Sequence, residues 1–170
     1  MSGLSLRPEK HGDEAKISAL TKAAFRDQPY SAGTEAQIIE GLREDGDLTL
    51  SLVAVEHGEI LGQISFSPVS INGVHGEWFG LGPVSVTPAR QSEGIGAKLV
   101  LDGLDRLRAL GANGCVLVGD PAYYSRFGFE GDCGLSYGDL DQAYVQGLAL
   151  TGPFRTGTIQ YARAFEEVAE

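Results

Sequence analysis

The stretch LGPVSVTPARQSEGIG, residues 81–96, decides how this chain of 170 residues folds. Its first six residues are mostly apolar and predict the end of a strand, although Gly82 and Pro83 interrupt them. Because proline cannot donate a hydrogen bond to a strand ladder, we expect the strand to splay beside Val84. The residues that follow form a glycine-containing turn, after which apolar residues recur at helical spacing over residues 95–110. The stretch therefore predicts a strand, a tight turn and a long helix.

The turn at residues 91–96 has the properties of an anion-binding turn. It includes the start of a helix, where the first backbone N–H groups have no acceptor within the helix. Gly94 and Gly96 would let the backbone approach a pyrophosphate closely and adopt positive φ. A Walker loop needs a hydroxyl residue after its lysine, which Lys98 lacks, and a dinucleotide fingerprint needs a third glycine where Leu99 stands. The alternative of a plain strand-to-helix corner stays open.

Hydrophobic periodicity elsewhere predicts one mixed α/β domain over residues 1–170. Thr34-x-x-Gln37 predicts a capping box at the start of the second helix. The other expected elements are a strand at 5–7, helices at 13–25 and 34–45, a hairpin of strands at 48–55 and 60–66, strands at 78–86 and 115–118, a short helix at 121–126, and closing strands at 144–150 and 158–162.

Two motifs together resemble the GNAT superfamily of N-acetyltransferases. Gln91–Gly96 has the Gln/Arg-x-x-Gly-x-Gly/Ala pattern of that superfamily's acyl-CoA turn, and Tyr124–Phe129 is similar to its later Tyr-x-Lys/Arg-x-Gly-Phe signature. Residues 35–43 and 52–62 resemble its uncharacterised bacterial YhbS-type branch, so the resemblance spans about residues 4–165. It implies an α/β (α+β) fold whose mixed, mostly antiparallel central sheet is flanked by helices and splayed at the acyl-CoA site.

The resemblance implies an acetyl-CoA-dependent N-acetyltransferase in which a primary amine attacks the thioester directly. A free backbone N–H on the splayed strand would stabilise the oxyanion that forms. Tyr124 would protonate the departing thiolate, and Glu77 is a candidate base, with a water chain as the alternative. The expected cofactor-binding residues are Val84, Ser85, Val86, Gln91, Ser92, Glu93, Gly94, Ile95, Gly96, Ala97 and Tyr124.

Each of these residues also has an ordinary structural interpretation. Tyr124 fits a core aromatic residue, and Glu77 fits a solvated turn. Arg90, Lys98 and Arg126 fit either ligands of the 3′-phosphate of coenzyme A or surface charges. The second functional hypothesis is therefore a domain that binds acyl-CoA as a sensor, or binds a partner, without catalysing transfer.

Other sequence features exclude several classes of function. The −10 net charge, from 13 Lys and Arg against 23 Asp and Glu, disfavours nucleic-acid binding. The pentapeptide at residues 134–138 has the G-x-S-x-G pattern of a hydrolase, but every histidine precedes Ser136, and the isolated histidines indicate no metal site.

Partners and location are predicted from the same features. The chain has no apolar run of the roughly 20 residues that a membrane span needs, so we expect a soluble cytoplasmic protein with Cys115 and Cys133 reduced. Its acceptor would be a small-molecule or peptide amine, with a homodimer conceivable through residues 144–150.

Overall fold

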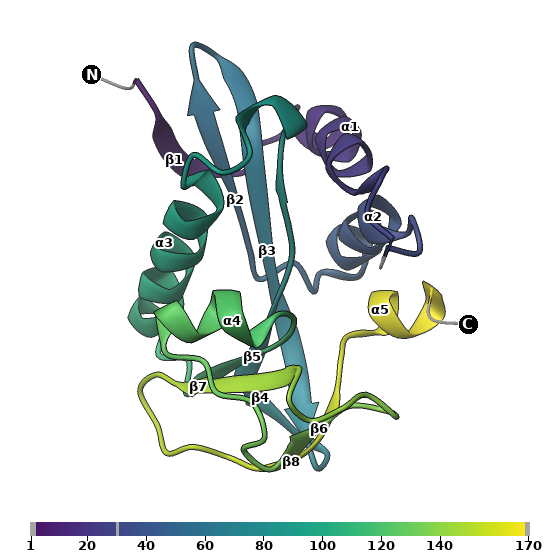
Figure 1. Ribbon diagram of the computed structural model, residues 1–170, viewed down its shortest axis with the longest axis vertical. Helices are drawn as coiled ribbons and strands as arrows, with labels where there is room; N and C mark the ends of the chain where they lie inside the picture. The colour runs from purple at the N-terminus through teal and green to yellow at the C-terminus, as the bar shows by residue number, and fades with distance from the viewer. Residues whose placement is uncertain (1–2, 30, 169–170) are drawn as a thin grey trace. The chain divides into compact units, whose positions relative to one another are not determined.

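The computed structural model describes residues 3–29 and 31–168 of the chain (Figure 1). These residues form eight strands, five α-helices and two short 3₁₀ helices. In chain order the elements are β1 (Ser5–Pro8), α1 (Glu14–Phe25), α2 (Glu35–Asp45), β2 (Leu50–Glu56), β3 (Glu59–Ile71), β4 (Val74–Val86), η1 (Pro88–Arg90), α3 (Ile95–Ala109), β5 (Gly114–Val118), α4 (Pro121–Tyr124), η2 (Ser125–Phe127), β6 (Leu135–Ser136), β7 (Val145–Ala149), β8 (Gly157–Gln160) and α5 (Arg163–Val168).

The strands are joined in the order β1-β2-β3-β4-β5-β7, and β8 pairs with both β3 and β6. The pairs β1–β2, β2–β3, β5–β7 and β3–β8 are antiparallel, whereas β4–β5 and β6–β8 are parallel. The predicted fold class, a mixed and mostly antiparallel sheet with helices, is therefore confirmed.

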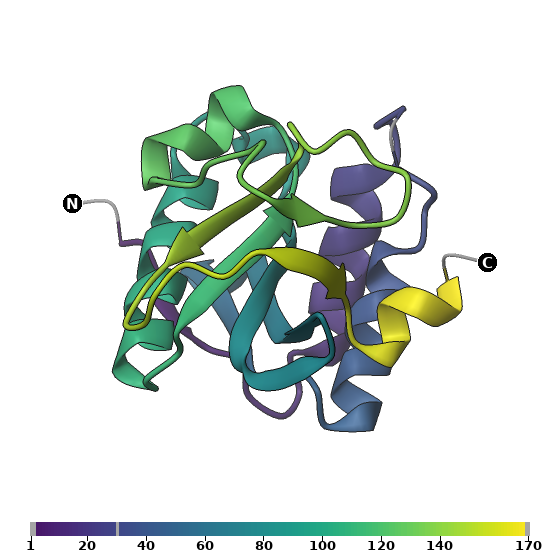
Figure 2. The ribbon, with the colours of Figure 1, turned by 90° about the horizontal axis from the view of Figure 1, so that it is seen from below.

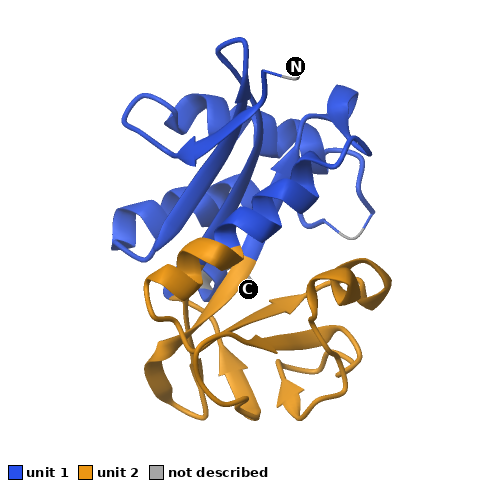
Figure 3. Cartoon of the chain, turned by 90° about the vertical axis from the view of Figure 1, so that its left-hand side faces the viewer, with its two compact units in different colours: residues 1–66, 82–103, 163–170 blue, residues 67–81, 104–162 orange. Residues whose placement is uncertain are grey.

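The chain divides into two compact units (Figure 3). Unit 1 comprises residues 1–66, 82–103 and 163–170, and unit 2 comprises residues 67–81 and 104–162. The backbone passes from one unit to the other within β3, β4 and α3. Each of these three elements therefore contributes side chains to both cores.

The core of unit 1 forms where α1 and α2 pack against β2. Ile17, Ile39 and Val53, one from each element, are at most 1% exposed and form one cluster. Burying each such side chain contributes about 1.5–3 kcal/mol. The first turns of α3 cover the opposite face of β2 and β3 (Figure 1), where a Cβ on Gly62 would lie 3.0 Å from Cδ1 of Leu99.

The core of unit 2 is built around Trp78 on β4. Its indole lies over Gly114, where a Cβ would come within 2.3 Å of Cζ2, so only glycine fits the paired position on β5. Phe154 meets the indole edge-on, with ring centroids 5.6 Å apart. β5 lies between β4 and β7 (Figure 2), and Cys115 is fully buried in it, as a free thiol.

Several element boundaries differ from the predicted ones. β3 and β4 are 13 residues each and so are longer than the predicted 60–66 and 78–86. The added part of β3 contains Ser67 and Ser70, which are buried although polar. The helix expected at residues 121–126 is divided into α4 and η2. β6 and α5 were not predicted, since two residues and six residues are too short to show a period.

The predicted capping box at the start of α2 is wrong. Thr34 makes no side-chain hydrogen bond to the helix. Instead Ser31 donates its hydroxyl to Glu35 at 2.7 Å and accepts from the backbone N–H of Gly33 at 2.9 Å. The hydroxyl that organises this helix start therefore lies one turn earlier than expected.

Candidate functional site

The predicted anion-binding turn lies entirely in unit 1, between the end of β4 and the start of α3. The Gln91 side chain donates to the carbonyl of Val86 at 3.0 Å and so ties the turn back to the strand. The first helical hydrogen bond of α3 runs from the N–H of Lys98 to the carbonyl of Gly94 at 3.1 Å. The N–H groups of residues 95–97 precede it and therefore have no acceptor within the helix.

Two residues of this turn have a left-handed backbone. Gly94 has φ +86°, as predicted, and Ser92 has φ +69°, which was not predicted because serine rarely adopts it. The expectation of positive φ at Gly96 is wrong, because Gly96 is the second residue of α3 and is helical. Gln91 to Gly94 are exposed while Ile95 is only 3% exposed, so a buried side chain anchors an exposed set of backbone donors.

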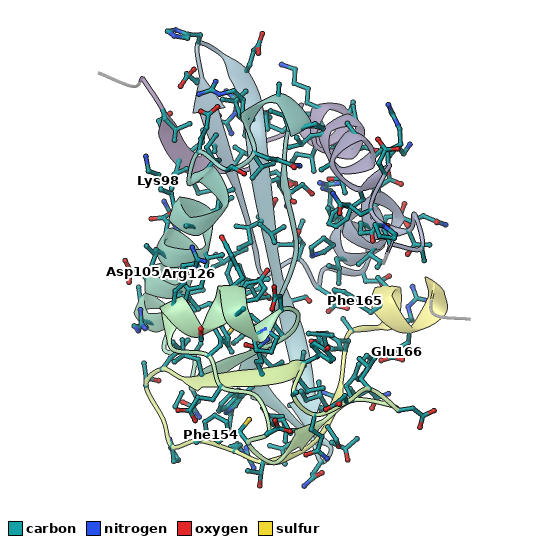
Figure 4. All side chains as sticks on the ribbon, in the orientation of Figure 1. Lys98, Asp105, Arg126, Phe154, Phe165 and Glu166 are labelled. Carbon is teal, nitrogen blue, oxygen red and sulfur yellow. The ribbon has the colours of Figure 1, made fainter. Side chains whose placement is uncertain are left out.

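Arg90 is already held by carboxylates. Its Nε donates to Glu93 at 2.9 Å, and its Nη1 donates to Glu56 at 3.0 Å. These bonds raise the pKa of the Arg90 guanidinium, and the same arginine lowers the pKa of the Glu56 carboxyl. Arg90 therefore offsets the negative charge of Glu93 inside the turn, which favours this role over a 3′-phosphate ligand. Lys98 is exposed on the first turn of α3 (Figure 4).

The predicted splay of the central strand is confirmed by the strand pairing. Parallel pairing of β4 with β5 covers Trp78 to Gly80, opposite Gly114 to Val116. Both strands continue beyond this point, and Gly82 takes a φ of +125° where β4 bends. Within the described residues, the end of β4 at residues 84–86 has no pairing with β5. Ser85 is 3% exposed, whereas Val84 and Val86 are half-buried.

The tyrosine motif forms a compact corner in unit 2. Asp120 caps α4 by accepting a hydrogen bond from the N–H of Ala122 at 2.9 Å, as predicted. The Tyr124 ring packs so closely on Gly119 that a Cβ there would lie 2.7 Å from Cε2. It also contacts Tyr123 and Phe129 edge-on, yet it remains half-buried. Tyr124 thus combines a fixed ring with partial access to solvent.

Arg126 and Glu77, which also belong to unit 2, both contact neighbouring protein groups. The guanidinium of Arg126 lies 4.3 Å from the Tyr123 ring centroid, and its Nε donates to the Tyr123 carbonyl at 2.8 Å. The Glu77 carboxylate accepts from Arg155, and its backbone carbonyl accepts from the N–H of Asn113 at 2.8 Å. These contacts favour a role for Glu77 in joining β4 to its neighbours rather than in removing a proton.

The predicted residues are therefore divided between the units. Unit 1 holds residues 84–86 and 91–97, and unit 2 holds Tyr124 and Glu77. Ser136 of the G-x-S-x-G pattern lies on β6, and a turn rather than a helix follows it, so the geometry of a hydrolase nucleophile is not formed.

Two further properties concern the whole described range. Among the side chains that the structure describes, no group of three or more His, Cys, Asp or Glu could hold a metal ion. In the same range, every helix is too short or too polar to cross a membrane.

The pair formed by Tyr137 and Tyr161 was not predicted from the sequence. Their ring centroids are 4.9 Å apart at an interplanar angle of 79°, and Tyr161 also packs on Gly80 of β4. Tyr137 stands at a variable position of the G-x-S-x-G pattern, and Tyr161 belongs to no recognisable motif. The available signal was Gly80, a glycine inside a strand, which often marks the close approach of another group.

Comparisons with known proteins identify the family. A family model described as an acetyltransferase (GNAT) domain matches residues 5–131. The uncharacterized N-acetyltransferase YhbS of Escherichia coli (strain K12) is 40% identical over 126 residues, which are 74% of this chain and 72% of that protein.

Two solved structures are similar over almost the whole chain. A GNAT family acetyltransferase from Brucella melitensis in complex with acetyl-CoA is 48% identical, with a TM-score of 0.86 over 97% of this chain and 99% of that one. YhbS from E. coli in complex with CoA is 33% identical, with a TM-score of 0.89 over 98% and 93% of the two chains. The expected resemblance is confirmed.

Proposed function

Because this chain belongs to the GNAT family of acetyltransferases, we propose that it transfers the acetyl group of acetyl-CoA to a primary amine by direct attack on the thioester. The observation that carries the proposal is the turn after β4, where Ser92 and Gly94 hold a left-handed backbone directly before the unpaired N–H groups of α3. A helix start of this kind binds phosphate groups readily. Two similar proteins have solved structures in complex with acetyl-CoA or CoA.

The turn at residues 91–97 would hold the pyrophosphate of the cosubstrate. The pantetheine arm would then lie along Val84–Val86, whose backbone has no β5 partner in the described chain, in the manner of an added strand. This arrangement places the thioester carbonyl beside the main-chain N–H groups near Val84. The extended contact would fix the thioester for attack, and positioning of this kind supplies a large part of the rate.

The chemical step follows from this placement. The neutral amine nitrogen forms a bond to the thioester carbon, and the carbonyl oxygen becomes an oxyanion that accepts a hydrogen bond from the β4 backbone. Collapse of this intermediate breaks the carbon–sulfur bond and releases the thiolate of coenzyme A. Tyr124 donates its hydroxyl proton to that thiolate, and the proton lost by the attacking nitrogen passes through water to the Tyr124 phenolate, which restores its hydroxyl.

The acceptor amine is proposed to be a cation in solution. The chain has a net charge of −10, and a negative field increases the encounter rate of cationic substrates.

Glu77 is assigned a structural role, since Arg155 donates a hydrogen bond to its carboxylate. Glu77→Gln should therefore leave the turnover rate nearly unchanged at neutral pH, where removal of the base that deprotonates an ammonium would slow turnover most.

Two measurements test the proposed function. Calorimetry should detect binding of acetyl-CoA, and thiol release with a panel of amines should identify an acceptor. Tyr124→Phe should then slow turnover by about 10²-fold while leaving acetyl-CoA affinity nearly unchanged. Tyr123→Phe is the matched control, because it removes a hydroxyl from the neighbouring ring in the same corner.

The outcomes separate the enzyme from its alternatives. If the protein binds acetyl-CoA but releases no thiol with any amine, and if Tyr124→Phe leaves the affinity for acetyl-CoA unchanged, the protein is an acyl-CoA sensor. No binding of acetyl-CoA at millimolar protein would refute both.

A further inference from the structure

The turn proposed to bind the pyrophosphate carries a carboxylate of its own. Glu93 lies between Ser92 and Gly94, the two residues of the turn that have a left-handed backbone. Its side chain is 46% exposed. A carboxylate at this position repels an anion that binds to the same turn. The charge of Glu93 must therefore be offset if the turn is to hold a pyrophosphate.

One guanidinium joins Glu93 to the end of β2. Nε of Arg90 lies 2.9 Å and 3.0 Å from the two carboxylate oxygens of Glu93. Nη1 and Nη2 of the same side chain donate to the two oxygens of Glu56 at 3.0 Å and 3.4 Å. Glu56 is the last residue of β2, and its side chain is only 17% exposed. All three residues belong to unit 1, as does the whole turn. Bonds to two carboxylates therefore fix the orientation of the guanidinium.

We propose that Arg90 is a positioning residue for the cosubstrate, because it masks the Glu93 carboxylate and so lets the turn at residues 91–97 accept the pyrophosphate. The inference rests on the proposed function, which places the pyrophosphate at this turn. Arg90 acts through Glu93 rather than as a phosphate ligand, since its Nε, Nη1 and Nη2 each donate to a carboxylate oxygen. The paired contact with Glu56 anchors the guanidinium to β2, and paired bonds of this kind are geometrically specific.

Calorimetry with acetyl-CoA tests this charge mask without knowledge of the acceptor. Arg90→Ala should weaken binding by about tenfold, because it leaves the Glu93 charge beside the pyrophosphate. Combining Arg90→Ala with Glu93→Gln should restore the affinity to within about threefold of the natural protein, since the unmasked charge is then absent. Glu93→Gln alone should bind acetyl-CoA at least as tightly as the natural protein. It provides the measurement if Arg90→Ala unfolds the chain.

Two further readouts separate a masked charge from a purely structural tie. Arg90→Lys keeps the positive charge without the planar fork, so it should weaken binding by no more than about threefold. The loss caused by Arg90→Ala should shrink as the salt concentration rises from about 0.1 M to about 1 M, because the Debye length falls from about 10 Å to about 3 Å. A structural tie predicts neither result.

Arg43→Ala is the matched control. Arg43 on α2 donates to the two oxygens of Glu9 at 2.8 Å and 2.9 Å, and its side chain is 24% exposed. The change removes one positive charge and one two-point ion pair from the same unit, as Arg90→Ala does. It should lower the melting temperature and leave the affinity for acetyl-CoA unchanged.

The failures of the two proposals differ. Normal acetyl-CoA affinity in Arg90→Ala, or a double variant that binds as weakly as Arg90→Ala alone, would overturn the mask and leave the proposed function standing. Weaker binding by a folded Glu93→Gln protein, or an equal loss in Arg43→Ala, would do the same. Absence of binding by the natural protein would overturn the proposed function and the mask with it.

Discussion

The proposed anion binding by the turn before α3 depends on the backbone conformation of single residues. Gly94 has φ +86°, and a Cβ built there would meet no atom within 4 Å, so space does not require glycine. The backbone conformation does require glycine, because a left-handed backbone costs an L residue about 1–2 kcal/mol. Ser92 already bears a cost of this kind at φ +69°. Strain of this type persists where surrounding structure enforces it, and it is frequent at ligand sites.

Gly94→Ala should weaken binding of acetyl-CoA by at least about tenfold, because relaxing the strain moves the N–H groups of the turn. Gly58→Ala is a matched control, since Gly58 has φ +79° in the β2–β3 hairpin and equally open surroundings. Both variants should lower the melting temperature by similar amounts, but only Gly94→Ala should change the dissociation constant measured by calorimetry. Equal affinities in the two variants would contradict the assignment of the turn.

At this scale the sequence predicted several features that depend on neighbours along the chain, although the Thr34 capping box and the positive φ at Gly96 were wrong. Gly94, the Asp120 cap and the splay beside Pro83 follow from local residue types. The pairing of Arg90 with Glu56, 34 residues away, does not, and neither does the packing of Tyr161 on Gly80. These contacts depend on how the elements pack, and the position of an arginine or tyrosine in the sequence does not indicate which distant residue it contacts.

At the scale of elements, the packing of α3 on β3 depends on a helical glycine. Gly→Ala inside a helix ordinarily stabilises it by about 1 kcal/mol. In α3, however, a Cβ on Gly103 would lie 2.3 Å from Cε2 of Phe66, whose side chain is fully buried. Overpacking of a core costs about 1–3 kcal/mol, so the clash outweighs the gain in helix propensity.

Gly103→Ala should therefore lower the free energy of unfolding, measured by urea denaturation. Phe66→Leu removes the ring and should itself be destabilising. Combining the two changes should cost less than their sum, because the added methyl group then occupies vacated space. Strict additivity in this double-mutant cycle would show that the helix and the strand do not meet as described.

The junction of β1 and α1 predicts a pH dependence. The Asp13 carboxylate, only 6% exposed, accepts from Nη1 of Arg7 at 2.8 Å and from the N–H of Lys10 at 2.9 Å. The bond from Arg7 is the main cause that lowers the pKa of Asp13 below its ordinary value. A lowered pKa in the folded state adds stability above the unfolded pKa, about 3.9, and this stability is lost as the pH falls through the folded pKa.

Asp13→Asn should lower the free energy of unfolding by about 1–3 kcal/mol at pH 7. The difference from the natural protein should shrink below about pH 4, since Asp13 itself then becomes protonated. Asp105→Asn is the control, because Asp105 is 76% exposed beside Arg108 and an exposed ion pair contributes little. A difference that stays constant from pH 7 to acid would refute the charge argument. Chemical denaturation across this range measures it.

Most elements were predictable because their periods extend over several turns or strand residues. α1, α2, α3 and β5 lie close to the predicted ranges for this reason. The length of β3 was not predictable, since its continuation contains Ser67 and Ser70, which are polar yet buried. Neither hydroxyl has a hydrogen-bond partner among the described residues, so their burial follows from packing rather than from a polar contact.

For the whole molecule, the route of the chain predicts cooperative unfolding. β3, β4 and α3 each begin in one unit and end in the other, so neither core can be completed without all three. Two independent domains would instead be joined by an exposed linker. Trp78, the single tryptophan, lies in the core of unit 2 and reports on that unit alone, whereas far-ultraviolet circular dichroism reports on both.

Acetyl-CoA should therefore shift both signals by the same amount, although the proposed pyrophosphate turn lies in unit 1. A ligand at 100 times its dissociation constant adds about 2.7 kcal/mol to the stability of the state that binds it. For a chain of this length that corresponds to a rise of roughly 5–10 °C in the unfolding midpoint. Trp78 fluorescence and circular dichroism should give coincident melting curves with and without the ligand. A circular dichroism transition that moves with acetyl-CoA while the Trp78 transition stays in place would show that unit 2 unfolds independently, and that the three shared elements do not couple the two cores.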